Sequence, residues 1–431
     1  MCRAHAFVFL VALAACSGGT DGPRAGGDGD SDLDGDTDAD AGDGDSAGGG
    51  DGDGVGDAAG GGFGWSAPRS LVDDLGRLAI GNDVHIVGHK GGDLVHRRSD
   101  DDGVTWGEPA VIAPASGNFP AMYGGLYALG ATVYLLTAPA DMDSSAAAGG
   151  RDLDFRKSVN GGADWSGPRR ITSTALIFRV RIVASGSYVH VVGTTNPTTN
   201  AALVYLRSID GGDNWEETTL ATDLGQYGGG QTVAVDGAVV HVAYTQAEDG
   251  PGGGPTFYRR STDNGENWSA PVPIGETSLE SDRQARVQLS AADGHVFAIW
   301  QREALYTGGA VPADRIGYAT SANGGAAWGS AQILPFDTGI DRNHHHVWLA
   351  PGGGVHVIWR HGDSGDTTDD PAGSLSSTDY GATWGSHDFA VDTRGVIAGA
   401  NHPWSVVADD AAVHALTGPS GAMQYARRPL K

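Results

Sequence analysis

The sequence predicts an all-β protein that forms a seven-bladed β-propeller of four-stranded antiparallel blades. Three observations lead to this prediction: one turn motif occurs six times, one alternating strand occurs seven times, and residues 63–72 copy the sequence that follows the motif. Repeats of this length are typical of propellers, in which each repeat supplies one blade. The alternative is a six-bladed ring with a loose end.

The turn motif has the form Ser-x-Asp/Asn-x-Gly-x-x-Trp, and its first serines are 59, 50, 53, 60 and 56 residues apart. Its third residues are Asp101, Asn160, Asp210, Asp263, Asn323 and Asp379. Asp and Asn can close a tight turn through their own backbone, and Gly accepts a positive φ angle. A feature repeated in every blade cannot mark one site, so we predict a structural role for these six residues. We expect the Trp to cover the gap between neighbouring sheets.

The motif resembles the Asp-box, or BNR repeat, of sialidases and related propellers. This resemblance implies that each box joins the third and fourth strands of a blade, on the face away from the ligand. Sialidases have six blades, so seven blades would be a departure. The family's first catalytic Arg has its nearest match in Phe178-Arg179-Val180-Arg181, which lacks the expected Pro and follows two boxes. The rest of the sialidase catalytic set is not recognisable.

Seven alternating strands accompany the six boxes, which leaves one blade without a box. The strands cover residues 84–87, 133–136, 189–192, 240–243, 296–299, 355–358 and 413–416. Residues 63–72 look like a fourth strand without its first three, and residues 403–430 look like three strands without their fourth. We therefore expect the N-terminal strand to complete the last blade, because this pairing removes two open sheet edges.

Two segments precede the propeller, so we divide the chain into residues 1–15, 16–62 and 63–431. Residues 1–15 hold a short apolar run after Arg3 and His5, which is typical of a signal peptide. Leu13-Ala14-Ala15-Cys16 resembles the lipobox of bacterial lipoproteins, which implies that Cys16 is acylated. Ser17 follows it, and by the family's sorting habit this favours a lipid anchor in the outer membrane of the cell envelope.

The segment after the lipobox is acidic and has almost no apolar residues. Residues 17–62 hold 13 Asp and 18 Gly, which predicts a disordered and self-repelling linker. Asp30-Ser31-Asp32-Leu33-Asp34-Gly35 mimics the start of a Ca²⁺ loop, but Ala41 stands where that loop needs a bidentate Glu. We expect weak Ca²⁺ association with the linker and no cofactor.

Charge and cysteine content exclude several function classes. The net charge of −26 argues against binding to nucleic acid, because a polyanion would be repelled. The two cysteines are Cys2 and Cys16, so the propeller has no disulfide and no thiol chemistry. We expect a monomer whose partner is a glycan or a cell-surface protein.

One arc of the ring breaks the repeat, and the candidate site lies there. The strand histidines at 85, 190, 241, 356 and 414 recur and are interpreted as partly buried scaffold. Departures at loop ends fall in blades five, six, seven and one, which are neighbours in a closed ring. The candidate ligand-binding residues are Arg342, Arg360, His402, Arg302, Asn343, Asn401, His346, Trp359, His89 and Lys90. The candidate catalytic residues are His344, His361 and Glu303.

These residue types suit an acidic sugar. Arg and Lys bind carboxylate or sulfate, Trp stacks on sugar C–H surfaces, and His and Glu transfer protons. His344, His346 and His361 are an alternative metal set, although we predict no metal. Strand alternation would put His344 and His346 on one face and His345 on the other.

Three functions remain open. The first is a cell-surface propeller that binds glycans, with acidic polysaccharide favoured; whether it also cleaves them, as a glycoside hydrolase or polysaccharide lyase, the sequence leaves open. The alternative is a non-catalytic surface module that binds glycan or protein. The second alternative is an exo-α-sialidase.

The lipobox gives a direct test of the predicted address. Replacing the acylated thiol by Cys16→Ser should move the protein from the membrane fraction to the soluble fraction, measured by fractionation and by fatty-acid labelling of the cell-expressed chain. A wild-type protein that takes up no fatty acid would contradict the lipobox prediction.

Overall fold

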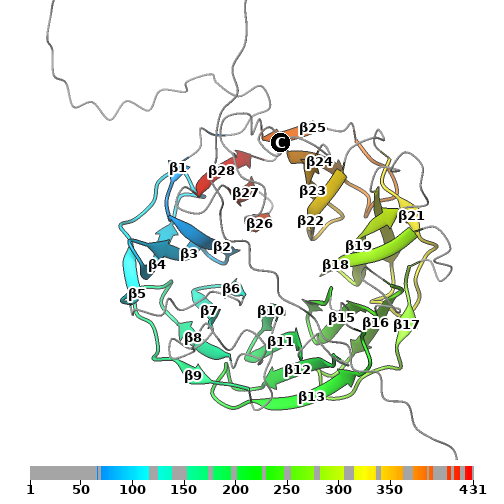
Figure 1. Ribbon diagram of the computed structural model, residues 1–431, viewed down its shortest axis with the longest axis horizontal. Coiled ribbons are helices and arrows are strands. Elements are labelled where there is room, and N and C mark those ends of the chain that lie inside the picture. The colour runs from blue at the N-terminus through cyan, green and yellow to red at the C-terminus, as the bar shows by residue number, and fades with distance from the viewer. Residues whose placement is uncertain are drawn as a thin grey trace, which may run out of the picture. The chain divides into compact units, whose positions relative to one another are not determined.

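The computed structural model is a ring of seven four-stranded antiparallel sheets (Figure 1). It describes residues 66, 69–115, 125–137, 153–172, 178–195, 201–225, 230–246, 254–275, 282–304, 315–335, 341–362, 372–385, 388–391, 405–408, 412–417 and 423–429. The predicted signal peptide, Cys16 and the acidic linker lie outside the described residues, as do Asn401 and His402. Within the described part of the chain, no helix is long and apolar enough to cross a membrane.

Each blade uses four consecutive strands, except the last. Blade 1 has β2 (Asp74–Ile80), β3 (Val84–Lys90), β4 (Asp93–Ser99) and β5 (Ala110–Ala113). Blade 2 has β6 (Leu126–Leu129), β7 (Thr132–Thr137), β8 (Asp154–Ser158) and β9 (Arg169–Arg170). Blade 3 has β10 (Phe178–Ser185), β11 (Tyr188–Thr194), β12 (Leu203–Ser208) and β13 (Glu216–Ala221). Blade 4 has β14 (Thr232–Asp236), β15 (Val239–Thr245), β16 (Thr256–Ser261) and β17 (Val272–Pro273).

The remaining blades include the one shared by both ends of the chain. Blade 5 has β18 (Asp282–Ala292), β19 (His295–Ala304), β20 (Arg315–Ser321) and β21 (Gln332–Ile333). Blade 6 has β22 (Asp341–Leu349), β23 (Val355–Gly362), β24 (Ala372–Ser377) and β25 (Asp388–Val391). Blade 7 has β26 (Ser405–Ala408), β27 (Ala412–Thr417), β28 (Gln424–Pro429) and β1 (Arg69–Ser70).

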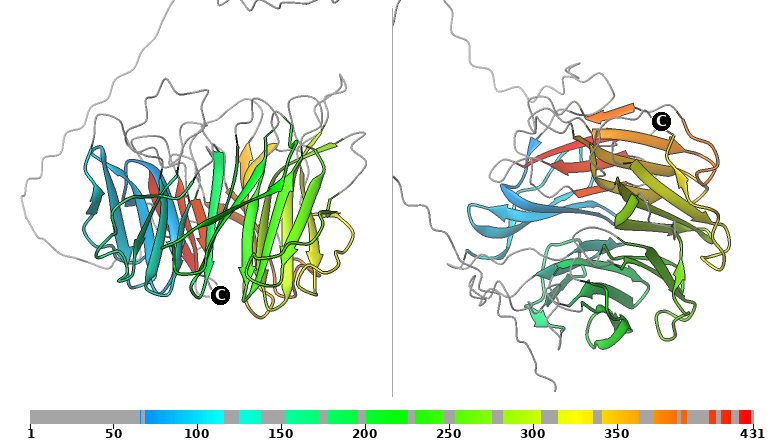
Figure 2. Two further views of the ribbon diagram at one scale, coloured as in Figure 1. Left: turned by 90° about the horizontal axis from the view of Figure 1, so that it is seen from below. Right: turned by 45° about the vertical axis from the view of Figure 1, so that its right-hand side comes forward.

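The first strand of each blade lies at the centre of the ring and the fourth at the rim (Figure 1). The first strands of successive blades contact one another all the way round, including β2 with β26. The strands run between two faces (Figure 2). The Asp-boxes and the turns between first and second strands lie on one, which we call the box face. The ends of the second strands and the starts of the third strands lie on the other, which we call the loop face.

The ring closes through β1, as the sequence predicts, and the six-bladed alternative is wrong. Arg69 pairs with Tyr425 and Ser70 with Gln424 in an antiparallel register. The Ser66 amide donates to the Arg427 carbonyl at 2.8 Å. Leu71 and Val72 follow β1 and are buried in a core cluster with Leu416, Met423 and Tyr425.

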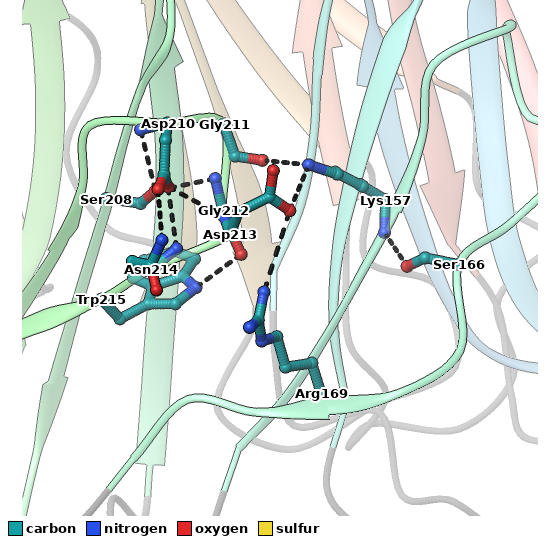
Figure 3. A network of polar contacts seen from close by, with 10 residues as sticks. All are labelled: Lys157, Ser166, Arg169, Ser208, Asp210, Gly211, Gly212, Asp213, Asn214 and Trp215. Carbon is teal, nitrogen blue, oxygen red and sulfur yellow. Dashed lines mark hydrogen bonds and ion pairs between the residues drawn. The ribbon is translucent and has the colours of Figure 1, made fainter.

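The boxes form closed turns, shown for blade 3 in Figure 3. Asp210 accepts hydrogen bonds from the Asn214 amide at 2.8 Å and from the Ser208 hydroxyl at 2.8 Å. The Gly212 amide donates to the Ser208 hydroxyl at 2.7 Å, and Trp215 Nε1 donates to the Gly212 carbonyl at 3.0 Å. The carboxylate is therefore occupied by its own turn, and hydrogen bonds led by the Asn214 side chain hold its pKa well below the usual range.

Neighbouring blades meet through an aromatic contact that involves each box. In blade 3, His190 Nδ1 lies 2.7 Å from Tyr205 Oη, and Trp268 from the blade 4 box packs edge-on against Tyr205 with ring centroids 4.9 Å apart. Gly265 of that box faces Tyr205 so closely that an added Cβ would lie 1.7 Å from Tyr205 Oη. Glycine is required there because any side chain would displace the tyrosine. We call this arrangement the His–Tyr–Trp contact.

The same three positions recur around the ring. They hold His241, Tyr258 and Trp328 between blades 4 and 5, and His414, Tyr425 and Trp106 between blades 7 and 1. They hold His85, His96 and Trp165 between blades 1 and 2, and Tyr134, Phe155 and Trp215 between blades 2 and 3. Between blades 5 and 6 they hold Phe297, Tyr318 and Trp384. The recurring strand histidines are thus interior scaffold.

Burial changes the titration of these histidines. His85, His190, His241 and His414 are each 0% exposed, which is deeper than the partial burial expected from the sequence. Burial lowers the pKa of His190 and of His241 to about 4, with a smaller contribution from a neighbouring Arg. Burial likewise lowers the pKa of His85 and His356 to about 4, and that of His96 to about 3.

Removal of residues 63–72 should open the ring. It would expose the edge of β28 and remove the buried Leu71 and Val72, which together contribute about 3–6 kcal/mol of burial. We expect calorimetry to show a melting temperature lower by about 5 °C or more. Removal of residues 1–57 is the control and should leave the melting temperature unchanged; equal melting temperatures for both truncations would contradict closure by β1.

The buried histidines predict a pH-dependent stability. An unfolded histidine takes up a proton near pH 6.5, whereas folded His190 does so near pH 4, so its stability contribution is complete above pH 6.5 and falls as the pH drops to 4. The variant His190→Phe/Tyr205→Phe should reduce the loss of stability between pH 7 and pH 5 by about 2 kcal/mol in urea titrations. Tyr205→Phe alone keeps the histidine and should keep the full pH dependence. An unchanged pH dependence in the double variant would contradict the assignment.

Candidate functional site

On the loop face, the inner hairpins of blades 5 and 6 are longer than the others. β18 and β19 have 11 and 10 residues, and β22 and β23 have 9 and 8. The first strands of the other blades have four to eight residues. We call residues 282–285 with 301–304, and 341–343 with 360–362, the extended hairpins. β18 and β19 both contact β22, so the two hairpins are adjacent.

The extended hairpins bring several predicted site residues together. In blade 6, Arg342 is opposite His361 and Asn343 is opposite Arg360. In blade 5, Glu303 is opposite Arg283 and Arg302 is opposite Gln284. Residues opposite each other on antiparallel strands have Cβ atoms about 5 Å apart. The register therefore brings these sequence positions together in two neighbouring hairpins.

A β-bulge lies within each extended first strand. The register shifts between Asn343 and His346 in β22, and between Ala285 and Gln288 in β18. A bulge adds a residue on one strand and changes the direction of the side chains that follow. The expected sharing of a face by His344 and His346 assumed unbroken alternation, so it does not apply across this bulge. His345 is buried and His346 is half-buried.

β2 and β10 have bulges at positions equivalent to those in β18 and β22, and the residues that follow these bulges are not among the predicted site residues. The first residue after the bulge is Arg77 in blade 1, Arg181 in blade 3, Gln288 in blade 5 and His346 in blade 6. All four are half-buried, and burial lowers the pKa of Arg77. Aligning the blades on the strand histidines would have found them, because each pairs with the residue two positions after the histidine or its replacement.

Below this polar level the first strands form an apolar neck. The neck encloses a cavity of about 350 Å³, and its lining includes Leu78, Val233, Leu289, Val347 and Val407.

Two predicted residues occupy other positions than expected. Trp359 is 0% exposed and packs in the core between blades 5 and 6, so its ring is not open to a ligand. His89 is 5% exposed, and its carbonyl accepts a hydrogen bond from the Asp73 amide at 2.7 Å. The sequence pattern did not separate strand interior from strand end for these residues. Lys90, one residue further, is exposed.

Among the side chains that the structure describes, which do not include those of His344 and His361, there is no group of His, Cys, Asp and Glu that could hold a metal ion. The backbone register places Arg342, Asn343, Arg360, His361, Arg302 and Glu303 on the extended hairpins, and His344 lies in the bulge of β22. These residue types include cations, which bind anionic groups, and His and Glu, which transfer protons.

Comparison with known proteins gives similarity of fold alone. No family model matches the chain, and no curated protein matches it. Among solved structures, an ulvan lyase is 14% identical over 67% of this chain and 75% of that chain, with a TM-score of 0.47. An α-L-arabinofuranosidase from Fusarium graminearum is 13% identical over 69% of this chain and 89% of that chain, with a TM-score of 0.46. A Hadza microbial sialidase is 15% identical over 68% of this chain and 64% of that chain, with a TM-score of 0.42. All three similarities are distant.

Proposed function

We propose that the protein binds an anionic glycan across the loop-face mouth, at the extended hairpins of blades 5 and 6. One observation carries this proposal: the register places Arg342 opposite His361 and Asn343 opposite Arg360 in blade 6, and the neighbouring blade 5 carries Arg302 and Glu303 on its extended hairpin. Guanidinium groups bind carboxylate and sulfate groups through paired charge-assisted hydrogen bonds. A polysaccharide bearing such groups is therefore the favoured ligand.

Cleavage of the bound polysaccharide is the second candidate function. It is supported by the backbone register, in which Glu303 is opposite Arg283 and His361 is opposite Arg342. A carboxylate and a neutral imidazole can both accept a proton. His344, beside the bulge in β22, is the third group proposed for proton transfer.

The proposed setting is the bacterial cell envelope. The lipobox at Leu13-Ala14-Ala15-Cys16 and the acidic residues 17–62 support a lipid-anchored propeller held away from the membrane. Mutual repulsion of the Asp residues extends such a chain.

The binding site is tested by Arg342→Ala/Arg360→Ala. Each charge-assisted contact contributes about 1.5–3 kcal/mol, so affinity for a carboxylated or sulfated polysaccharide should fall more than a hundredfold in calorimetric titrations. The matched control is Arg169→Ala/Arg170→Ala, which removes the same charge from β9 and should leave affinity unchanged. Equal losses in both variants, or an unaffected Arg342→Ala/Arg360→Ala protein, would contradict the proposed site.

Cleavage is tested separately on the same polysaccharides. His361→Ala and Glu303→Gln should abolish product formation, measured as new reducing ends or as ultraviolet absorbance of unsaturated sugars, while Asp263→Ala in a box should lower stability and leave turnover of the folded protein intact. If the wild type binds and releases no product, the protein is a non-catalytic binding module.

A further inference from the structure

A second pattern break lies on the box face, between blades 5 and 6. Five blades carry a cation on the third strand, at the residue opposite the strand histidine or its replacement. These residues are Arg98, Lys157, Arg207, Arg260 and Arg427. We call this cation the latch, because it reaches the box of the next blade.

Each latch meets the fourth or sixth residue of the neighbouring box. Lys157 Nζ donates to the Gly211 carbonyl at 3.0 Å and pairs with Asp213 at 2.8 Å (Figure 3). Arg260 donates to the Gly324 carbonyl at 3.0 Å. The other three contacts are Arg207 with Glu266 at 3.8 Å, Arg427 with Asp102, and Arg98 alongside Gly161. The fourth residue of the box therefore accepts a cation in three of the five interfaces, at Gly211, Gly324 and Asp102.

Blade 5 has no latch, although blade 6 has a complete box. The residue opposite Phe297 is Thr320, whose hydroxyl is too short to reach across. Phe297 replaces the strand histidine, and Tyr318 Oη donates instead to Gln332 Oε1 at 2.7 Å. In the facing box the fourth residue is Tyr380, and the sixth is Ala382.

A pocket of about 380 Å³ lies at this position. Its lining includes Thr320, Tyr318, Gln332, His295, Asp379 and Tyr380. The Tyr380 ring stacks on His295 with centroids 3.6 Å apart, which fixes an aromatic side chain at the pocket. The carbonyl of Tyr380 corresponds to the carbonyls of Gly211 and Gly324, the latch acceptors in blades 3 and 5.

We propose that this pocket binds an alkylammonium group, supplied by a lysine side chain of a partner or by a free polyamine. The ligand takes the place of the missing latch: its charge lies at the box-turn carbonyl and the Tyr380 ring, and its methylene chain lies along Phe297 and Leu349. The net charge of −26 draws cations to the surface.

The charge state of the box supports this assignment. Hydrogen bonds led by the Thr383 hydroxyl lower the pKa of Asp379 to about 2, so its carboxylate is ionised at neutral pH. The latches of the other blades do not reach the box of blade 6, because each of them already contacts the box of its own neighbouring blade.

The experiment compares three ligands of equal length: n-butylammonium, n-butanol and n-butyrate, titrated by nuclear magnetic resonance against the full chain at low salt. Butylammonium should bind at least tenfold more tightly than the other two and should weaken as salt is raised. Nα-acetyl-lysine N-methylamide, which keeps its ε-ammonium group, represents a lysine side chain of a protein. Its affinity is then compared with that of spermidine to distinguish a protein side chain from a polyamine. Stronger binding of butanol, or of a neutral monosaccharide, would overturn the proposal.

Variants locate the binding. Thr320→Arg supplies the missing latch and should reduce butylammonium affinity at least tenfold, whereas Thr320→Val, of equal size and uncharged, should retain it. Tyr380→Gly, which installs the residue found at this position in boxes 2, 3 and 5, should also weaken binding and covers the case in which Thr320→Arg does not fold. Unchanged affinity in the folded Thr320→Arg protein, or in Tyr380→Gly, would overturn the proposal.

Discussion

The whole ring depends on the contact between a third-strand aromatic residue and the box of the following blade. Each box offers a glycine to the ring of the preceding blade and then covers that ring with its Trp, as Gly265 and Trp268 do for Tyr205. The box therefore folds its own turn and also seals its neighbour. Blade 7 has no box, and blade 6 correspondingly has Ser374 at the aromatic position, which accepts a hydrogen bond from Arg428 of β28 at 3.1 Å. A blade therefore has an aromatic residue on its third strand where the following blade has a box, and lacks one where the box is missing.

This constraint divides the two faces of the ring. The box face must repeat, because each box has to match the blade before it, whereas the loop face carries no such requirement. The extended hairpins lie on the loop face, and the bulges at Asn343 and Ala285 lie just below them. The bulge separates the register of Arg342 and Arg360 from that of Val355 and Val357, so the extended hairpin can vary without disturbing the core at these two valines.

The fold was predictable from the sequence because its signals are local and repeated. The box spacing, the seven alternating strands and the orphan segment at residues 63–72 are sufficient to give seven blades and their closure. The site was predictable only in outline. Departures from the repeat indicated the arc that we propose as the site. The positions of Arg77, Arg181 and His346 show only when the blades are aligned on the strand histidines, because each first strand carries one extra residue at its bulge. The burial of a side chain was not predictable either, because it depends on packing against the neighbouring blade. The repeat pattern does not distinguish the buried Trp359 from an exposed residue at the end of a strand.

Closure by β1 also determines the order of events during synthesis. Ser66 and Arg427, which exchange two hydrogen bonds, are 361 residues apart in the chain. At about 5–20 residues per second, a ribosome needs about 20–70 s to make the second partner after the first. During that interval blades 1 to 6 can form in turn, but the side of blade 1 that Leu416 and Met423 finally cover stays open to solvent. The nascent chain therefore spends most of its synthesis as an incomplete ring with an apolar seam, and aggregation competes with the arrival of its last few dozen residues.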